Sequence, residues 1–358
     1  MDAESRLRRW LRPQLLQSQS YHVPDSRGLI KLDAMENPYA LPDSLRERLL
    51  DALRDAPLNR YPDPQARELR ELLIAQLGLA DGLDLIFGNG SDELIQLLAI
   101  ALAGEDRVVL APTPGFVMYK VLAEALGMRF VGVPLGPDFS LDKSAMLEAI
   151  ARHQPALVYL AYPNNPTGNL FDEQAMRDII GAAPGLVVVD EAYSPFSARS
   201  FAGWLGQYDN LLLMRTLSKQ GLAGLRLGYL LGPRAWIQEL DKLRLPYNIN
   251  VLTQIAARVV LEQPAELESQ AREICESRQR LFAALGRLSG ISVHPSDANF
   301  LLFRVPAGQG GRIFQGLLEQ GILIKNLHGT PGLEDCLRVT VGTPQENASF
   351  LQALERIL

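Results

Sequence analysis

The chain has 358 residues, of which 47% are hydrophobic and 21% charged, and its formal net charge is −6. This length and apolar content predict a large buried core, divided between one big domain and a smaller one. The negative charge argues against nucleic-acid binding, and no apolar run is long enough to cross a bilayer, so we expect no membrane contact. Two cysteines, Cys275 and Cys336, indicate a reducing, cytoplasmic setting without a disulfide framework.

The first forty residues are predicted to be an irregular arm. Its only basic cluster is interpreted as a solvated helix face and consists of Arg6, Arg8, Arg9 and Arg12. A helical pattern covers 42–55, and two prolines then forbid a continuous helix over 59–64. Tyr61 therefore lies in a rigid loop, where a packed structural tyrosine is as good an interpretation as a functional one.

A glycine turn joins a strand to a helix in the next stretch. After a helix over 65–77 and a strand over 85–87 comes Gly88-Asn89-Gly90-Ser91-Asp92-Glu93, and a helix follows over 94–102. Ser91 or Asp92 can cap this helix. The turn offers free backbone N–H groups and the positive end of a helix dipole to an anion, although a simple N-cap is the commoner meaning.

Strands and helices then alternate along the chain, which is typical of a mainly parallel sheet covered by helices on both faces. The expected strands are 107–111, 129–133, 156–161, 185–189 and 211–214, with helices at 115–126, 143–152 and 173–182. A further strand at 226–231 is expected to be antiparallel to its neighbours. Helices at 234–243 and 251–261 complete this large domain.

The C-terminal part predicts a small α/β domain. A long amphipathic pattern over 265–288 leads out of the large domain. It is followed by strands at 299–305, 322–325 and 336–341 and by helices at 313–319 and 344–357. We expect an arm and part of the small domain in residues 1–40, the large domain in 41–265, and the small domain in 266–358.

Polar clusters follow the strands of the predicted parallel sheet, where ligand sites of such sheets lie. They are 88–92, 112–116, 162–168, 190–193 and 218–219. Each cluster alone is a weak signal, but their convergence at one sheet edge is a strong one.

The stretch 216–226 carries the most distinctive chemistry. Lys219 lies between hydroxyl residues, beside a glycine-rich turn, with Arg226 seven residues further on. Small residues let the backbone approach a ligand, and hydroxyls with an arginine suit a phosphate. An amine near fixed positive charge has a lowered pKa and can form a Schiff base with an aldehyde. A lone lysine at a strand end is ordinarily a solvated residue, so this interpretation needs the other clusters.

Asp190 ends a fully apolar strand and should be partly buried, where a carboxylate needs a partner. Helix capping or an arginine would be the usual partner, and the protonated nitrogen of a pyridoxal phosphate ring is an equally good one. Tyr193 and Asn165 could then bond the phenolic oxygen of that ring. Phe116 could stack on its face, although a core aromatic is the plainer interpretation.

Together these motifs resemble the fold type I pyridoxal-phosphate aminotransferases of the aspartate aminotransferase superfamily. The motifs are Asn165-Pro166-Thr167-Gly168, Asp190-Glu191-Ala192-Tyr193 and Ser218-Lys219, in this order. Two further stretches, Arg60-Tyr61-Pro62 and Leu337 to Thr343, resemble the histidinol-phosphate aminotransferases among them. The resemblance covers nearly the whole chain. It implies a large domain with a mainly parallel seven-stranded sheet between helices, plus a smaller C-terminal α/β domain.

The resemblance also implies roles for individual residues. Lys219 would hold the cofactor, pyridoxal 5'-phosphate, and shuttle the proton. Asp190 would pair with the ring nitrogen, and Phe116 would stack on the ring. The residues implied at the phosphate and beside the ring are Gly90, Ser91, Asp92, Asn165, Tyr193, Ser218 and Arg226. The resemblance also implies a homodimer with shared active sites, in which Tyr61 reaches the phosphate bound by the partner subunit. No metal is expected.

For the substrates, the resemblance implies L-histidinol phosphate as amino donor and 2-oxoglutarate as acceptor, with glutamate formed in histidine biosynthesis. Arg338 would bind the anionic end of both. Tyr21, Asn37, Asn165 and Lys325 are expected at the same substrate site. Lys325 stands where relatives often have an arginine; it still attracts phosphate but lacks the bidentate fork.

Other functions on the same fold remain open: an aromatic amino-acid aminotransferase or a threonine-phosphate decarboxylase. A non-catalytic, pyridoxal-phosphate-sensing regulator is a further alternative. It would need a basic DNA-binding segment for which the proline-interrupted arm is too short.

Overall fold

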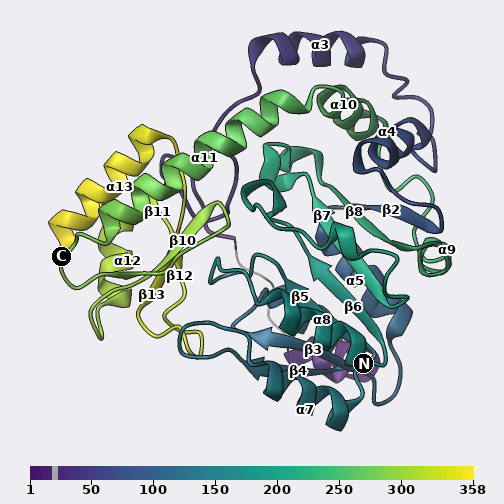
Figure 1. The fold of residues 1–358 in the computed structure, drawn as a ribbon, viewed down its shortest axis with the longest axis horizontal. Helices are drawn as coiled ribbons and strands as arrows, with labels where there is room; N and C mark the ends of the chain where they lie inside the picture. Colours follow the sequence, from purple (N-terminus) through teal and green to yellow (C-terminus); the bar gives the residue numbers. More distant parts are fainter. Residues whose placement is uncertain (18–22) are drawn as a thin grey trace.

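The computed structural model describes residues 1–17 and 23–358 and shows two α/β units, each built on its own sheet (Figure 1). The larger sheet has seven strands in the order β2-β8-β7-β6-β5-β3-β4. They are β2 (Leu83–Asn89), β3 (Val108–Thr113), β4 (Arg129–Pro134), β5 (Leu157–Ala161), β6 (Leu186–Asp190), β7 (Leu211–Thr216) and β8 (Leu227–Pro233). All pairings are parallel except those of β8, which is antiparallel to β2 and β7. This confirms the predicted mainly parallel sheet and its antiparallel strand.

Both faces of this sheet are buried, which explains why its central strands are continuous apolar runs. In β6, Val187 and Val189 pack in one hydrophobic cluster, and Leu186 and Val188 pack in the other. The first cluster includes side chains of α3 (Asp43–Arg54), α4 (Arg67–Leu77), α7 (Lys143–His153), α8 (Glu173–Ala182) and α10 (Val251–Leu261). The second includes side chains of α5 (Ser91–Leu102), α6 (Val117–Ala125) and α9 (Arg234–Asp241).

Short 3-10 helices lie in the loops between the last strands of the large sheet. They are η1 (Ser194–Phe196), η2 (Ala202–Trp204), η3 (Ser218–Gln220) and η4 (Ala223–Leu225). The last two form the turn between β7 and β8. The chain therefore folds back sharply at Lys219, and Thr216 on β7 pairs with Gly228 on β8.

The smaller unit contains a four-stranded sheet in the order β12-β13-β10-β9 and the two-stranded pair β1-β11. Its strands are β1 (Ile30–Lys31), β9 (Ser292–Val293), β10 (Phe300–Arg304), β11 (Ile322–Leu323), β12 (Lys325–Asn326) and β13 (Cys336–Thr340). Its helices are α11 (Pro264–Leu285), α12 (Gly310–Glu319) and α13 (Pro344–Ile357). The single strand expected over 322–325 is two short strands in separate sheets, because β11 pairs in parallel with β1 from the N-terminal segment.

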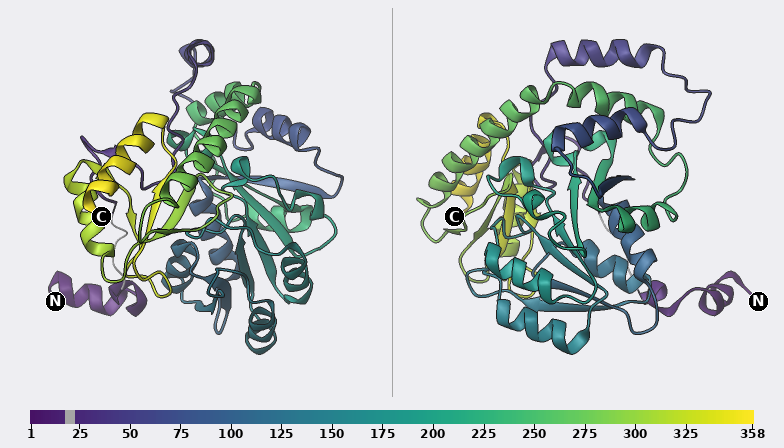
Figure 2. Two further views of the ribbon diagram at one scale, coloured as in Figure 1. Left: turned by 60° about the vertical axis from the view of Figure 1, so that its left-hand side comes forward. Right: turned by 45° about the vertical axis from the view of Figure 1, so that its right-hand side comes forward.

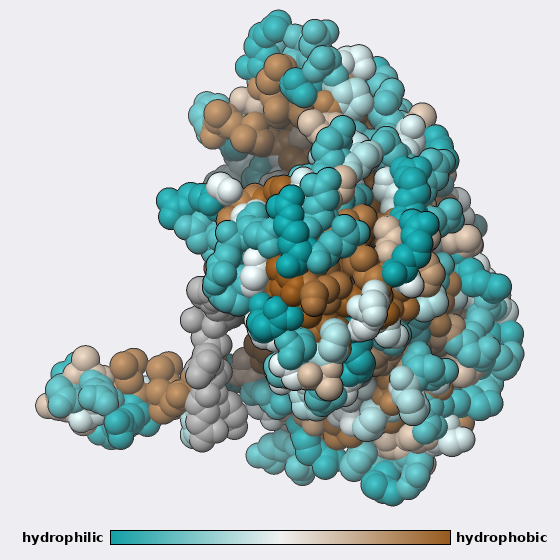
Figure 3. Space-filling model, turned by 90° about the vertical axis from the view of Figure 1, so that its left-hand side faces the viewer, coloured by the Kyte–Doolittle hydropathy of each residue, from teal (hydrophilic) through white to brown (hydrophobic). Residues whose placement is uncertain are grey.

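The expectation of an irregular N-terminal arm was wrong for residues 3–17, whereas 23–29 and 32–40 contain no helix or strand. The arm contains α1 (Ala3–Trp10) and α2 (Pro13–Gln17), and the side chain of Asp2 caps α1 on the backbone N–H of Ser5. This segment projects from the body (Figure 2), and the space-filling view shows apolar side chains on it (Figure 3). Trp10 is 75% exposed there, and no residue of α1 is buried in the described part of the chain. The basic residues of α1 are exposed, as predicted.

Residues 1–17 and 23–358 contain neither a helix suited to crossing a membrane nor a group of side chains suited to holding a metal ion. No helix there is long and apolar enough to cross a membrane. No group of three or more histidine, cysteine or acidic side chains in these ranges is arranged to hold a metal ion.

Candidate active site

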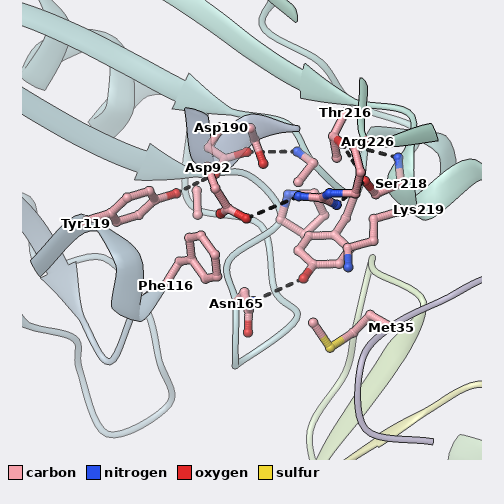
Figure 4. Close-up of a pocket in the computed structure, with 15 residues that line it drawn as sticks. Met35, Asp92, Phe116, Tyr119, Asn165, Asp190, Thr216, Ser218, Lys219 and Arg226 are labelled. Carbon is pink, nitrogen blue, oxygen red and sulfur yellow. Dashed lines mark hydrogen bonds and ion pairs between the residues drawn. The ribbon is translucent and has the colours of Figure 1, made fainter. Parts of the chain in front are cut away.

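The polar clusters predicted at the strand ends meet around a cavity of about 100 Å³ at the edge of the large sheet (Figure 4). Nine of the predicted site residues line it: Ser91, Asp92, Phe116, Asn165, Asp190, Tyr193, Ser218, Lys219 and Arg226. They come from six different segments, so the cavity exists only because the parallel strands end at one edge.

Asp190 lies at the end of β6 and is only 6% exposed. Its Oδ1 accepts the backbone N–H of Ala192 at 3.0 Å, and its Oδ2 accepts the hydroxyl of Tyr119 at 2.6 Å. Burial raises the pKa of this carboxyl to about 6, although both hydrogen bonds favour the anion. Among the described residues no basic side chain forms an ion pair with it, so a cation entering the cavity would find an uncompensated carboxylate.

Lys219 follows β7 in the tight turn at η3, and its Nζ donates to the backbone carbonyl of Ala34 at 3.0 Å. The amine lies 6.0 Å from the ring centre of Tyr193. Burial, followed by the charges of Arg338 and Arg226, lowers the pKa of this amine to about 8. About a tenth of this amine is therefore neutral and nucleophilic at pH 7.

The N-terminus of α5 and the turn after β7 form an end of the cavity suited to an anion. Helix α5 begins at Ser91, one turn earlier than the expected 94, and its N-cap is Gly90 with no side-chain capping bond. The first backbone N–H groups are thus left for a ligand. Gly90 has φ +79°, and a Cβ there would lie 2.5 Å from Nη2 of Arg226. Only glycine lets the guanidinium come this close to the turn.

Hydroxyl groups and a guanidinium complete this end. Thr216 donates to the hydroxyl of Ser218 at 3.0 Å, and Nη1 of Arg226 donates to the same oxygen at 3.4 Å. Asp92 also faces Arg226, at 3.5 Å, in a half-exposed pair. A phosphate would have two hydroxyls, helix N–H groups and one guanidinium as partners.

Asn165, Tyr193 and Arg338 form a connected row on the opposite side. Nδ2 of Asn165 donates to the hydroxyl oxygen of Tyr193 at 3.0 Å, and Nη1 of Arg338 donates to Oδ1 of Asn165 at 2.5 Å. Arg338 is 6% exposed, and its guanidinium lies 5.2 Å from the ring centre of Phe300. Burial raises the pKa of the Tyr193 hydroxyl, so this group remains a donor.

A second cavity of about 800 Å³ adjoins the first and is large enough for a substrate. Phe116 and Asn165 line both cavities. Lys325 and Arg338 reach the larger one from the smaller unit, and Lys120 reaches it from α6. Cationic side chains on both sides make it suitable for an anionic substrate.

Residues 33–37 form a connection between the two units that the sequence did not reveal. The backbone carbonyl of Asp33 accepts Nη2 of Arg338 at 3.0 Å, and the next carbonyl, of Ala34, holds Lys219. Met35 has φ 54°, its N–H donates to Oγ1 of Thr340, and its carbonyl accepts Nδ2 of Asn299. We call residues 33–37 the strap.

Several predicted site residues lie outside both cavities. The Asn37 carboxamide is used internally, by Gln220, Gln270 and the backbone of Tyr39, so its predicted substrate contact is not supported. Tyr61 is 80% exposed and stacks on Tyr247 with ring centres 4.5 Å apart, so it does not reach its own chain's cavity. Tyr21 lies outside the described residues.

Tyr119 and Met35 were not predicted as site residues, and Thr216 was predicted without a specific role. All three line the smaller cavity. Tyr119 lies one helical turn after Phe116, and this spacing was the only signal for it. Nothing in the sequence indicated that Met35 approaches Lys219 from a distant segment.

Comparison with known proteins places these features in a family. The family model for aminotransferase class I and II matches residues 27–354. The chain is 56% identical to histidinol-phosphate aminotransferase 2 of Nitrosococcus oceani over 98% of each chain. It is 53% identical to histidinol-phosphate aminotransferase 2 of Cupriavidus pinatubonensis, over 93% of this chain and 92% of that one. The crystal structure of histidinol-phosphate aminotransferase from Sinorhizobium meliloti in complex with pyridoxal-5'-phosphate superposes with a TM-score of 0.87, at 26% identity over 97% of each chain.

Proposed function

We propose the following function for this chain, which belongs to the aminotransferase class I and II family. It uses pyridoxal 5'-phosphate to transfer the amino group of L-histidinol phosphate to 2-oxoglutarate, giving imidazole-acetol phosphate and L-glutamate in L-histidine biosynthesis. The relatives at 56% and 53% identity support this substrate in preference to an aromatic amino acid or a threonine phosphate.

The residues of the smaller cavity fit pyridoxal 5'-phosphate. The N-terminus of α5, with Ser91, Ser218 and Arg226, suits its phosphate, and the buried Asp190 lacks the cation that a protonated ring nitrogen would supply. When bound, this cofactor supplies an aldehyde that bonds an amine and an electron-poor ring that takes up charge. Phe116 would flank the ring, and Asn165 with Tyr193 would hold its phenolic oxygen.

The single observation that carries the proposal is that Lys219 lines the same cavity as Asp190 and Arg226 (Figure 4), with a pKa lowered to about 8. With the cofactor bound, a neutral Lys219 amine would bond its aldehyde, and the freed amine would accept and return a proton near neutral pH. The Ala34 carbonyl, 3.0 Å away, is a fixed acceptor for the amine when it is free.

Arg338 is the proposed anion-binding residue for both substrates, and Lys325 the proposed second cation. Arg338 is buried and oriented from two sides, by Asn165 and by the Asp33 carbonyl. In this proposal, residues 41–265 form the cofactor-binding domain, and residues 266–358 form the small domain, whose cationic side chains bind the substrates. Because histidinol phosphate and 2-oxoglutarate are both anions, one arginine can serve both half-reactions.

The active enzyme is proposed to be a cytoplasmic homodimer in which Tyr61 serves the partner's site. This residue is exposed on a proline-stiffened loop beside Tyr247. Exposed leucines nearby in sequence, Leu58 and Leu245, are suited to burial against a second chain.

A substrate screen tests the proposal. Purified protein loaded with cofactor is mixed with each donor, and the cofactor's absorbance bands are followed before 2-oxoglutarate is added. Histidinol phosphate should give a kcat/KM at least about 100-fold above those of aromatic amino acids and threonine phosphate. A higher kcat/KM for an aromatic amino acid would show that this amino acid is the substrate and that histidinol phosphate is not. Carbon dioxide release from threonine phosphate would show that the protein is a decarboxylase.

A further inference from the structure

We propose that Tyr119 is a positioning residue: its hydroxyl, bonded to Oδ2 of Asp190, keeps that carboxylate ionised and turned toward the cavity. The consequence for the cofactor rests on the proposed pairing of Asp190 with the ring nitrogen. The hydrogen bond itself joins two side chains of the protein and involves no ligand, so it can be tested without any substrate.

The geometry fixes the Tyr119 hydroxyl in one place. Its oxygen lies 2.6 Å from Oδ2 of Asp190, and the side chain is 3% exposed. The Tyr119 ring stacks on Tyr159, with centres 4.2 Å apart and planes within 2°, and meets the edge of Phe116 at 5.5 Å. Held on two sides, the ring cannot swing the hydroxyl away from the carboxylate without opening the core.

The direction of this bond decides which state of Asp190 it stabilises. Burial and the neighbouring Asp190 charge raise the pKa of Tyr119 well above its usual value, so its hydroxyl keeps its proton and donates. A donor aimed at a carboxylate oxygen favours the ionised form. With Ala192 on Oδ1 and Tyr119 on Oδ2, each oxygen retains a lone pair for a further donor.

The groups around Asp190 disfavour its ionised form, and the hydrogen bond from Tyr119 opposes them. Asp92 from α5 and the adjacent Glu191 both raise the pKa of Asp190, in addition to burial. Tyr159 from β5 and Tyr193 also face it, and both keep their protons because burial raises the pKa of each hydroxyl. The cations of the cavity, Lys219 and Arg226, form no ion pair with it. The two hydrogen bonds are therefore what favours the anion before cofactor binds.

The chain offers a matched control in Tyr159. It is equally buried and lies flat against Tyr119, yet within the described part of the chain its hydroxyl oxygen has no hydrogen-bond partner. Tyr159→Phe therefore removes a hydroxyl from the same stack and leaves the bond to Asp190 in place.

The test is a carboxyl titration by infrared spectroscopy on cofactor-free protein, from about pH 5 to pH 9, with Asp190→Asn used to assign the band. In Tyr119→Phe the midpoint of Asp190 should move to higher pH by about one pH unit or more. In Tyr159→Phe it should stay in place. A ring-fluorinated tyrosine at position 119, a more acidic donor in the same shape, should move it the opposite way, to lower pH.

Cofactor binding gives a second readout. At about pH 5, Tyr119→Phe should weaken pyridoxal 5'-phosphate binding roughly tenfold, and the loss should shrink to about twofold at pH 7 as Asp190 ionises again. An unmoved midpoint in Tyr119→Phe, or an equal movement in Tyr159→Phe, would overturn the proposal. Since no amino donor enters either measurement, a wrong substrate assignment would leave both results intact.

Discussion

The Lys219 amine lies where its charge is disfavoured, first by burial and then by Arg338 and Arg226, and its pKa falls to about 8. The unfolded chain keeps the ordinary pKa of about 10.4. Between these two values the unfolded state binds more protons than the folded state, so the free energy of unfolding rises with pH in this window. Below the folded-state value, the buried charge lowers stability to its full extent.

We therefore predict that Lys219→Met stabilises the cofactor-free protein at about pH 7, by up to about 3 kcal/mol. The difference should fall to a few tenths of a kcal/mol near pH 10.5, because the amine is then neutral in the folded state and about half neutral in the unfolded state. Chemical denaturation at the two pH values measures it. A stability difference that is the same at both would mean that the Lys219 charge is well solvated.

Arg338 is expected to serve both substrates. Arg338→Ala should raise the KM for histidinol phosphate and for 2-oxoglutarate together, each by roughly 10- to 100-fold, the usual value of a charge-assisted contact. Arg304→Ala is the control, since Arg304 lies on the neighbouring strand β10, donates to the carbonyls of Glu334 and Gly332, and is not among the residues that line either cavity. If only one substrate is affected, the two do not share this arginine.

Site residues marked by their own local sequence could be predicted. Their hydrogen-bond partners, which are distant in the sequence, could not. Asp190 ends an apolar strand and Lys219 lies in a polar turn, so both could be singled out. Tyr119 bonds a residue 71 positions away, and the Lys219 partner, Ala34, is 185 positions away and contributes only its backbone. A contact to a backbone carbonyl leaves no pattern of residue types in the sequence, so it could not be predicted.

At the scale of elements, the strap connects the small unit to Lys219 in the large unit. Met35 is held in a left-handed conformation that costs a non-glycine residue about 1–2 kcal/mol, and the hydroxyl of Thr340 accepts its buried N–H. Two successive strap carbonyls then bind Arg338 and Lys219. The strap thus fixes both cations from one short segment.

Thr340→Val should lower the free energy of unfolding by about 1–3 kcal/mol, because the Met35 N–H loses its acceptor inside the core. Thr340→Ser keeps the oxygen and should recover most of this loss. Denaturant melts of the three proteins give the comparison. Equal stability of the valine and serine variants would show that the hydroxyl bond contributes nothing.

The elements themselves were largely predictable, because strands buried on both faces and amphipathic helices leave clear patterns. The errors have physical causes. Helix α5 begins at Ser91 because a glycine serves as N-cap, and no side-chain cap marks the boundary. The two-residue strands β1 and β11 exist only through their pairing with each other, which no local period encodes.

At the scale of the whole molecule, the exposed Tyr61 loop and the projecting α1 are the parts that one chain leaves without a core. If Tyr61 completes the partner's site, mixing inactive Lys219→Ala with weakly active Tyr61→Ala should raise activity as subunits exchange. One site of the mixed dimer then has an intact Lys219 from one chain and an intact Tyr61 from the other. With exchange confirmed by native mass spectrometry, activity equal to the mean of the two parents would place Tyr61 in its own chain's site or in none.

The central claim, amino transfer at Lys219, is tested most directly by following the nitrogen atom. Histidinol phosphate labelled with heavy nitrogen in its amino group is incubated with 2-oxoglutarate and the cofactor-loaded protein, and the products are weighed by mass spectrometry. The account predicts labelled glutamate and imidazole-acetol phosphate in equal amounts, and neither with Lys219→Ala. Unlabelled glutamate, or label released as ammonia, would contradict it.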